Sequence, residues 1–362
     1  MHIVYVIDRL STHGGADNHI YDVIEAVCAQ GWQVTIAAGQ VQPGLVLPKR
    51  VRVQRVRGLA RPVHDHRGLS HLEALVDQAD VVHTQNVMNP VALTMLAEVN
   101  KTVMTVQDHR MFCPGPGKTL PEGQPCTTTM SSAACKVCLP EDDYRERTLL
   151  LTQQRLNTLA SMRLIVLSQY MVDELSAVGL SAVVIPPWTH SFPHNAQPGI
   201  GFMLGGRLVS HKGITACYEA WQNADVNQPL NIAGTGPLEG TLSGAHFLGW
   251  LSRQELYNAL HQSRALLFAS RWQEPFGIIA VEALACGTPV IVIDSGGTTE
   301  WSARGCVTVD SHSQMSQAIQ SLATDPQLAQ RLGEEGQHHV HSRYPKDPAV
   351  QRLLTIYSDV AH

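Results

Sequence analysis

Two glutamates in the second half of the chain stand in surroundings that suggest chemistry. Glu282 is the only charge in a predicted helix over 277–286, whose other residues are apolar or small. A helix that is apolar on all sides is buried, and an unpaired buried carboxylate is costly. Glu282 therefore needs hydrogen-bond donors, either from a buried ion pair or from sugar hydroxyl groups of a ligand. Glu274 lies eight residues earlier, about 12 Å away along a helix, too far for the ~5 Å carboxyl pair of a retaining glycosidase.

Cationic side chains precede another predicted helix, which begins near Gly213. Arg207, His211 and Lys212 all lie within the six residues before it. A cation at a helix N-terminus is unfavourable by about 0.3–1 kcal/mol, so an anion is expected beside these side chains unless they extend into water. A second candidate anion site is the set of backbone amides that begin the helix over 277–286, those of Phe276, Gly277 and Ile278.

Glycine pairs follow two of the predicted strands, at the edge where doubly wound sheets bind ligands. They are Gly14-Gly15, after the strand over 2–8, and Gly296-Gly297, after the strand over 289–294. Either pair allows a tight turn or the close approach of a ligand to the backbone. The glycine-rich segment 234–240 departs from a dinucleotide fingerprint in spacing and position, and we interpret it as a turn.

Four of the eight cysteines fall within one short segment. They are Cys113, Cys126, Cys135 and Cys138, in the spacing C-x12-C-x8-C-x2-C. Four thiolates ending in a C-x2-C pair suit tetrahedral Zn²⁺, although the first two spacings differ from those of standard zinc ribbons. A structural zinc site is the favoured interpretation, with free thiols and an iron–sulfur cluster as alternatives.

The elements that must position these residues alternate between strand and helix. In the first half, short β-branched runs predict strands over 2–8, 33–39, 80–86, 102–108 and 164–169. In the second half they predict strands over 201–208, 231–234, 246–249, 265–270, 289–294 and 306–309. Helices are expected between these strands, one of them begun by a capping box from Ser252 to Glu255. This order predicts an α/β protein of two doubly wound parallel sheets that face each other across a cleft.

The predicted domains follow from this pattern. Residues 1–190 form the N-terminal domain, with a Cys-rich insertion over 110–140, and a proline-rich linker follows over about 190–200. Residues 200–345 form the C-terminal domain, and a last helix occupies 346–362.

Composition limits the function classes. The chain has 362 residues, 44% of them apolar and 16% charged, which fits two globular domains. The net charge of −5 argues against a nucleic-acid-binding protein. No apolar run is long enough to span a membrane and the first residues do not resemble a signal peptide, so a cytoplasmic protein is expected.

One local stretch is strongly basic. It contains Lys49, Arg50, Arg52, Arg55, Arg57, Arg61 and Arg67. An exposed edge strand is the favoured interpretation, because Val51 and Val53 alternate with the charges. The alternative is a site for a phosphate-bearing acceptor or for contact with the inner membrane surface.

Six motifs together resemble the retaining GT-B glycosyltransferases of family 4, the group 1 glycosyl transferases. They are GGADNH (14–19), GRLVSHKG (206–213), AGTGP (233–237), FLGWLSRQEL (247–256), EPFGIIAVEALACGTPVI (274–291) and SGGTTE (295–300). The likeness spans almost the whole chain and is densest from 201 to 300. It implies a GT-B fold whose last helix crosses back to the N-terminal domain, a nucleotide-sugar donor, and a sugar-containing or lipid-linked acceptor. The absence of an Asp-x-Asp motif fits a family that needs no cofactor for catalysis.

The resemblance also assigns roles to residues. The implied catalytic set is Glu274, Arg207, Lys212 and Asp108. The implied substrate-binding set is Gly14, Gly15, Gln107, Arg207, Lys212, Phe247, Leu248, Glu274, Phe276, Gly277, Ile278 and Glu282. In such enzymes the two cations hold the diphosphate and neutralise the leaving group, and Glu282 accepts hydrogen bonds from the ribose.

At one position the sequence differs from the family. Gln107 stands where the family has a histidine that contacts the donor sugar, and a glutamine can form hydrogen bonds but carries no charge. This difference motivates the alternative of a non-catalytic or partner-dependent protein that binds a nucleotide sugar. An epimerase of the same fold is a second alternative. A nicotinamide dehydrogenase is not favoured, because no glycine fingerprint follows the first strand of either half.

Overall fold

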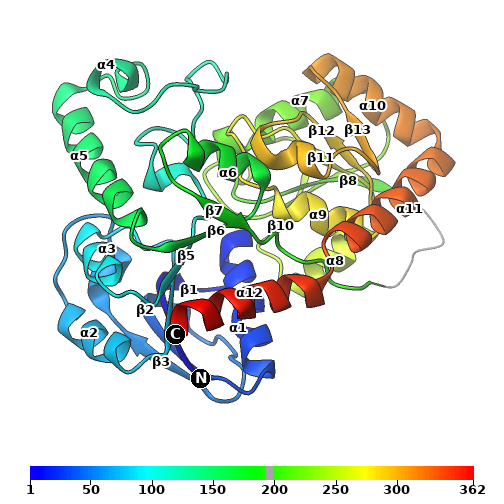
Figure 1. Ribbon diagram of the computed structural model, residues 1–362. Helices are drawn as coiled ribbons and strands as arrows, with labels where there is room; N and C mark the ends of the chain where they lie inside the picture. The colour runs from blue at the N-terminus through cyan, green and yellow to red at the C-terminus, as the bar shows by residue number, and fades with distance from the viewer. Residues whose placement is uncertain (193–198) are drawn as a thin grey trace. The chain divides into compact units, whose positions relative to one another are not determined.

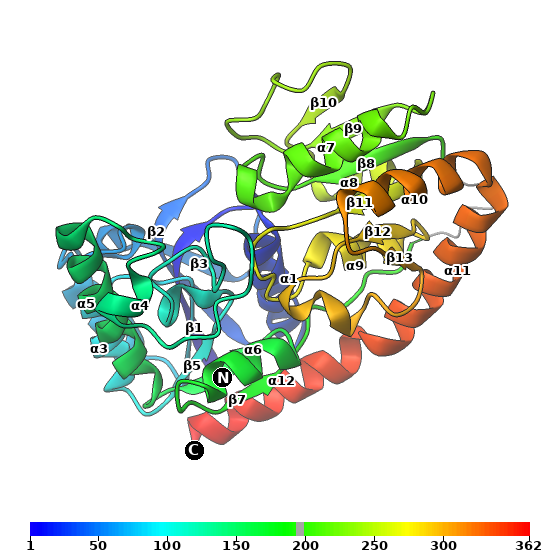
Figure 2. The same cartoon turned by 90° about the horizontal axis from the view of Figure 1, so that it is seen from above.

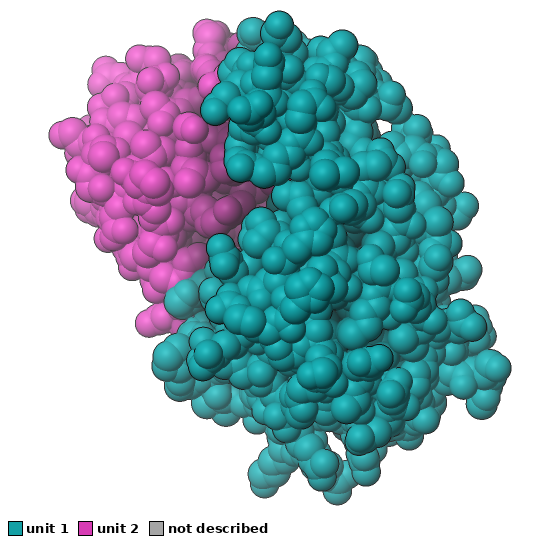
Figure 3. Space-filling view, turned by 90° about the vertical axis from the view of Figure 1, so that its left-hand side faces the viewer, with its two compact units in different colours: residues 1–186, 347–362 teal, residues 187–346 magenta. Residues whose placement is uncertain are grey.

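The structure is a computed structural model that describes residues 1–192 and 199–362 (Figures 1 and 2). The chain divides into two compact units, coloured separately in Figure 3. Unit 1 comprises Met1–Pro186 and Asp347–His362, and unit 2 comprises Pro187–Lys346. Most of the linker predicted over 190–200, namely residues 193–198, lies outside the described residues.

Unit 1 contains a seven-stranded parallel sheet in the order β3-β2-β1-β4-β5-β6-β7. The strands are β1 His2–Leu10, β2 Gln33–Val41, β3 Val51–Arg55, β4 Val81–Gln85, β5 Thr102–Thr105, β6 Arg163–Val166 and β7 Ala182–Val184. The chain builds outward from β1 to β3 and then returns to the other side of β1. The strand order therefore reverses between β1 and β4, and this is where doubly wound sheets bind ligands.

Helices cover both faces of this sheet, which explains why its central strands are continuous apolar runs. They are α1 Gly15–Ala29, α2 Leu69–Asp77, α3 Pro90–Ala97, α4 Ser132–Cys135, α5 Asp142–Leu159, α6 Gln169–Ser176 and α12 Lys346–Ala361, with short 3-10 turns η1 Arg57–Ala60 and η2 His109–Met111. Val4 and Val6 of β1 pack into the core formed with α2, α3, α5 and α6. The intervening residue, Tyr5, points to the opposite face and contacts α12.

A buried polar chain fixes α12 to the sheet of unit 1. The hydroxyl groups of Tyr5 and Tyr357 lie 3.2 Å apart, and the Tyr357 hydroxyl is 2.5 Å from Nδ1 of His83. The other ring nitrogen of His83 lies 2.7 Å from Thr105 Oγ1. Burial lowers the pKa of His83 to about 3. The ring is therefore neutral, with one nitrogen donating and the other accepting.

Unit 2 contains a six-stranded parallel sheet in the order β10-β9-β8-β11-β12-β13. The strands are β8 Gly201–Gly205, β9 Leu230–Ala233, β10 His246–Gly249, β11 Ser263–Phe268, β12 Val290–Val292 and β13 Cys306–Thr308. The helices are α7 Ile214–Asn223, α8 Arg253–His261, α9 Ile278–Ala285, α10 His312–Thr324 and α11 Pro326–Arg343, with 3-10 turns η3 Ser210–Lys212 and η4 Gly296–Glu300. Helices α7 and α10 lie side by side over one face (Figures 1 and 2) and bury Cys217, Met315 and Ile319 against the strands.

The predicted fold class is confirmed: both units are built on parallel sheets, and the last helix packs on the N-terminal unit. The capping box from Ser252 to Glu255 is present at the start of α8. Several strands end earlier than expected, among them β5, β6 and β8 by three residues each. β5 stops at Thr105 instead of residue 108 and β8 at Gly205 instead of residue 208, because the chain turns there into loops at the carboxyl edge of each sheet. Among the described helices, none is long and apolar enough to cross a membrane.

The depressed pKa of His83 predicts a pH-dependent stability. Between pH 6.5 and about 3 the unfolded chain binds a proton at this position that the folded chain does not bind, so stability falls as the pH falls through this range. From pH 7 to pH 5 the loss from His83 alone is about 2 kcal/mol. Urea unfolding of the wild type and of His83→Gln measures this, and the variant should show a shallower pH slope. His312→Gln, at an exposed position, is the matched control and should keep the wild-type slope.

Candidate functional site

At the carboxyl edge of the unit 2 sheet, the turn between η3 and α7 requires a glycine, Gly213. Gly213 has φ 71°, and a Cβ atom built there would lie 1.8 Å from the carbonyl oxygen of Ala269. This close approach brings η3 against the loop that follows β11. Lys212, the last residue of η3, is thereby held beside residues 270–274.

Lys212 and Glu274 form an ion pair at this edge. Lys212 Nζ donates to Glu274 Oε1 over 2.6 Å, and the Glu274 side chain is 7% exposed. Lys212 also lies over the Trp272 ring, 5.5 Å from its centre. The sequence predicted an anion beside the cations that precede α7, and for Lys212 this anion is a carboxylate of the protein itself.

The glycine pair after β12 holds the Glu274 loop in place. The amide of Gly297 donates to the carbonyl oxygen of Glu274 over 2.7 Å, and the amide of Gly296 donates to Oε1 of Gln273 over 3.0 Å. A Cβ atom at Gly296 would lie 2.5 Å from the Glu274 carbonyl oxygen. These glycines therefore act by positioning the carboxylate, a role that their spacing alone did not indicate.

The remaining cations lie close to this pair but differ in exposure. His211 stacks on Trp272 with ring centres 5.2 Å apart. Partial burial lowers the pKa of His211, and the charges of Lys212 and Arg207 add to this effect. Arg207 is exposed, and among the described residues it has no ion-pair partner. Its guanidinium group is available to an anionic ligand.

Glu282 differs from its prediction. It lies on α9 as expected, but its side chain is half-buried instead of fully enclosed. The Tyr257 hydroxyl donates to Glu282 Oε1 over 3.4 Å. The helix is apolar on all sides because its neighbours are the sheet, α8 and α11, whereas the position of Glu282 on the helix surface leaves it partly open to solvent.

The start of α9 lies deep in the unit. The Phe276 side chain is 1% exposed, and its carbonyl oxygen accepts from Trp301 Nε1 over 2.5 Å. Gly277 has φ 88° and precedes the first helical residue, Ile278. The expected helix-start amides are therefore present next to Glu274.

The loops after β8 and β9 pack against each other. A Cβ atom at Gly234 would lie 1.8 Å from the carbonyl oxygen of Gly206, and one at Gly236 would lie 2.6 Å from that of Leu208. The glycine-rich segment 234–240 thus permits the close contact of two backbone loops. Beside it, on the edge strand β10, Phe247 is half-buried and Leu248 is 39% exposed.

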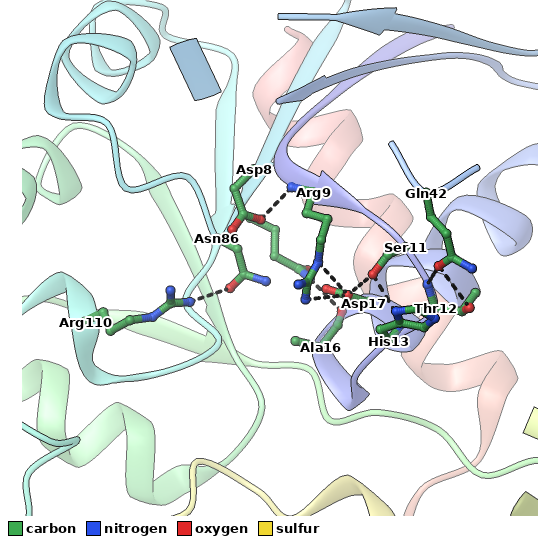
Figure 4. A network of polar contacts seen from close by, with 11 residues as sticks. Asp8, Arg9, Ser11, Thr12, His13, Ala16, Asp17, Gln42, Asn86 and Arg110 are labelled. Carbon is green, nitrogen blue, oxygen red and sulfur yellow. Dashed lines mark hydrogen bonds and ion pairs between the residues drawn. The ribbon is translucent and has the colours of Figure 1, made fainter. Parts of the chain in front are cut away.

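At the carboxyl edge of the unit 1 sheet, a network of charged residues surrounds the start of α1 (Figure 4). Asp17 is buried and pairs with Arg9 over 2.9 Å, and it also accepts a hydrogen bond from the Ser11 hydroxyl. Ser11 in turn accepts from the amide of His13. These contacts fix the loop that leads to Gly14 and Gly15, where α1 begins.

Asp108 lies at the same edge, after β5. Its carboxylate accepts from Arg110 Nε over 2.8 and 2.9 Å and caps η2 through the amide of Arg110. Burial would raise the pKa of Asp108, but the charge and hydrogen bonds of Arg110 outweigh it and hold the pKa below its usual value. Arg110 also donates to Asn86 Oδ1 over 3.4 Å (Figure 4).

Gln107 occupies a buried position next to Asp108. Its Nε2 lies 2.9 Å from Nδ1 of His19, and both side chains are less than a tenth exposed. A histidine is thus present in this pocket, but it comes from α1 instead of the end of β5. His109, which follows Asp108, is fully buried and contacts the Tyr170 hydroxyl over 2.9 Å.

Sequence reasoning missed Asp8, which lies at the end of β1 where the strand order reverses. The register pairs Ile7 with Gln85, so Asp8 and Asn86 follow on neighbouring strands. Burial raises the pKa of Asp8 to about 6, although the charge of Arg110 opposes the shift. The available signal was a carboxylate near the carboxyl end of a buried strand.

The four clustered cysteines do not form the predicted zinc site. Throughout residues 1–192 and 199–362, no group of three or more His, Cys, Asp or Glu side chains is placed to hold a metal ion. Cys113 Sγ instead accepts from the amide of Lys118 over 3.4 Å, and the Cys138 thiol donates to the carbonyl oxygen of Thr119 over 3.8 Å. Burial raises the pKa of both thiols, and the charges of Cys126, Cys113 and Cys135 raise that of Cys138 further, so these thiols lie near one another. As placed, however, they do not form the ligand set of the predicted metal.

Two family models match this chain. Residues 192–339 match the model of glycosyl transferases group 1, and residues 14–188 match that of a glycosyl transferase 4-like domain. The chain belongs to this glycosyltransferase family. The first match contains Arg207, Lys212, Glu274 and Glu282, and the second contains Gly14, Gly15, Gln107 and Asp108.

Sequence identity to individual members of the family is low and covers only part of the chain. Glycogen synthase of Mycobacterium tuberculosis is 30% identical over 169 residues, which are 42% of this chain and 41% of that protein. The matched region thus spans about two fifths of this curated relative.

Solved structures agree with the fold. Sucrose-phosphate synthase of Thermosynechococcus elongatus is similar with a TM-score of 0.72 and 18% identity over 99% of each chain. Anabaena Alr3699/HepE, solved in complex with UDP and glucose, is similar with a TM-score of 0.68 and 15% identity over 99% of this chain and 100% of that chain. At these identities the likeness concerns the fold alone.

The glycine at the turn before α7 can be tested by a matched pair of substitutions. Gly213 and Gly31 have similar φ values, 71° and 79°, but a Cβ atom at Gly31 meets nothing within 4 Å. Both Gly31→Ala and Gly213→Ala incur the cost of a left-handed alanine, about 1 kcal/mol. Gly213→Ala should lose at least ~2 kcal/mol more, because it also clashes with backbone. Equal losses in urea unfolding would show that the clash at Ala269 does not constrain this turn.

Proposed function

We propose that this family member is a retaining glycosyltransferase that moves a sugar from a nucleotide-diphosphate sugar to a hydroxyl group of an acceptor. The observation that carries the proposal is the edge of the unit 2 sheet. There an exposed arginine, Arg207, lies near the ion pair between the half-buried Lys212 and the buried Glu274. Such a set can bind a diphosphate through its cations and sugar hydroxyl groups through its carboxylate.

Each residue of this edge has a role in the proposal. Arg207 and Lys212 bind the diphosphate, and the amides of Phe276, Gly277 and Ile278 add donors at the start of α9. Glu274 accepts from the hydroxyl groups of the transferred sugar. Glu282, which is half-buried and accepts from Tyr257, binds the ribose hydroxyl groups in the proposal. The backbone of Phe247 and Leu248 on β10 borders the base.

The reaction follows from these charges. The bond from the anomeric carbon to the β-phosphate oxygen breaks, and a bond from the acceptor oxygen to the same carbon forms on the same face. The acceptor proton passes to the departing phosphate oxygen. Negative charge therefore grows on the phosphate, where Arg207 and Lys212 stabilise it. Positioning of donor and acceptor supplies the remaining rate enhancement.

Unit 1 is proposed to supply the acceptor side. Gly14 and Gly15 begin α1 with free amides, and Gln107 and Asp108 lie near this loop at the carboxyl edge of the sheet. Asp108 is engaged by Arg110, so its role in the proposal is to orient groups at this edge rather than to act as a free base.

Two alternatives to transfer remain: an epimerase, which shares the fold, and a non-catalytic protein, which Gln107 motivates. Because Gln107 is buried against His19 and cannot carry a charge, a protein that binds a nucleotide sugar without turnover stays a second candidate. Product analysis separates the three possibilities: a glycosylated acceptor indicates a transferase, an isomerised sugar an epimerase, and binding without product a non-catalytic protein.

Nucleotide binding is the first expected outcome. At 100 times its dissociation constant, the matching nucleoside diphosphate adds about 2.7 kcal/mol to stability and raises the unfolding midpoint. Thermal unfolding with UDP, GDP, ADP and dTDP identifies the base. Arg207→Ala and Glu282→Ala should lose the shift, whereas Glu219→Ala and Arg331→Ala, both exposed sites in unit 2, should keep it. If no nucleotide shifts the midpoint, the donor assignment is wrong.

A double substitution separates the catalytic role of Lys212 from its structural one. Lys212→Met leaves the Glu274 carboxylate buried and unpaired, so it should cost ~2–4 kcal/mol of stability as well as at least ~100-fold in kcat. Adding Glu274→Gln removes the uncompensated charge and should restore most of the stability. Because Glu274 also binds the transferred sugar in the proposal, Glu274→Gln alone is the reference, and sugar transfer in the double variant should be lower still. Recovery of kcat together with stability would contradict a role for Lys212 at the leaving phosphate.

A further inference from the structure

A second charged surface lies in unit 1 and contains none of the residues assigned above. Strand β3 is the edge strand of the sheet, and five cations lie on it and on the turns before and after it: Lys49, Arg50, Arg52, Arg55 and Arg57. We call this set the basic edge. All five side chains are exposed, and within the described residues none of them forms an ion pair.

The chain on either side of the basic edge carries no acidic residue that could neutralise these cations. No Asp or Glu occurs anywhere from residue 26 to residue 64, in a chain whose net charge is −5. The first carboxylate beyond that range, Asp65, is bound by Arg67 over 2.6 Å. The basic edge is therefore a positive surface on an acidic protein, and its field is available to an external anion.

Protection of the edge strand β3 against pairing with other sheets explains only some of these exposed residues. Charged residues on β3, such as Arg52 and Arg55, prevent edge-to-edge pairing of sheets. They do not explain the loop between β2 and β3, where Val46 is 81% exposed. This loop, PGLVLP over 43–48, presents an aliphatic tip directly before Lys49 and Arg50. Val41, at the end of β2, is also exposed, at 38%.

The residue types around the basic edge favour one class of anionic partner over others. Residues 39–62 contain no Phe, Tyr or Trp, whereas single-stranded nucleic acids are bound by stacking on aromatic rings and protein interfaces are enriched in aromatic anchors. An aliphatic tip flanked by Lys and Arg instead matches an anionic lipid surface. The apolar residue enters the headgroup boundary and the cations remain with the lipid phosphates.

We infer that the basic edge and the loop over 43–48 dock unit 1 on membranes that contain anionic lipids. Each cation near such a surface contributes about 1 kcal/mol, and the contribution decays within a Debye length. Five cations with one exposed valine thus give binding that is reversible and strongly dependent on salt. The inference does not depend on the proposed transfer reaction, because it uses no residue of the donor or acceptor sites.

Co-sedimentation with vesicles tests the inference on the full-length chain. At 0.1 M salt the wild type should bind vesicles of phosphatidylcholine with 30% phosphatidylglycerol, should bind pure phosphatidylcholine at least ~10-fold less, and should be released at 0.5 M salt. Arg52→Glu with Arg55→Glu should lower the partition coefficient at least ~10-fold. Val46→Asp should lower it as well, through the loop tip.

Matched controls keep the result interpretable. Arg163→Glu with Arg352→Glu makes the same change in net charge at exposed positions of unit 1 outside the basic edge, and this variant should bind as the wild type does. Unchanged unfolding midpoints exclude misfolding, because all the substituted side chains are exposed. Equal binding to neutral vesicles, equal loss in the control variant, or full binding by Val46→Asp would each overturn the inference. Equally tight binding of a single-stranded oligonucleotide would also overturn it, since the surface would then be a general polyanion site.

Discussion

The ion pair between Lys212 and Glu274 is the interaction on which the carboxyl edge of unit 2 depends. A carboxylate that is only 7% exposed needs a partner, and Lys212 Nζ supplies it at 2.6 Å. The backbone is arranged to make this possible. Gly213 lets η3 approach the carbonyl oxygen of Ala269, and Gly296 and Gly297 bind the Glu274 loop from the other side. Three loops that follow three different strands are thereby fixed around one pair of charges.

In unit 1 the carboxylates at the carboxyl edge of the sheet are also held by side-chain partners, but these partners are several. Asp17 is held by Arg9 and Ser11, and Asp108 by Arg110, whose charge and hydrogen bonds hold the pKa of Asp108 below its usual value. Asp8 differs, because burial raises its pKa to about 6 and outweighs the opposing charges of Arg110 and Arg9. This edge thus combines carboxylates of different basicity at the point where the strand order reverses. Such a combination suits the recognition of hydroxyl groups.

The C-terminal helix shows how a terminal segment becomes part of a distant unit. Tyr357 lies at the centre of a buried chain that links Tyr5, His83 and Thr105. Only an uncharged imidazole can serve in this position, because burial disfavours the protonated form. The helix is therefore coupled to the protonation state of a core residue as well as to apolar packing.

The amino-acid sequence determined the alternation of strands and helices, since apolar periodicity and turn residues act over a few positions and are independent of the rest of the fold. It also indicated Glu274, Glu282, Arg207 and Lys212 as unusual, because charges in apolar or helix-start surroundings carry a predictable energetic cost. Only the tertiary structure determined which side chains form ion pairs and hydrogen bonds with each other. Residues 62 positions apart form the central ion pair, His19 and not a residue of β5 brings the ring to Gln107, and the clustered thiols bond to nearby backbone instead of forming a metal site. Spacing along a chain cannot encode these outcomes, because side-chain partners are fixed only when loops from different strands meet at the edge of a sheet.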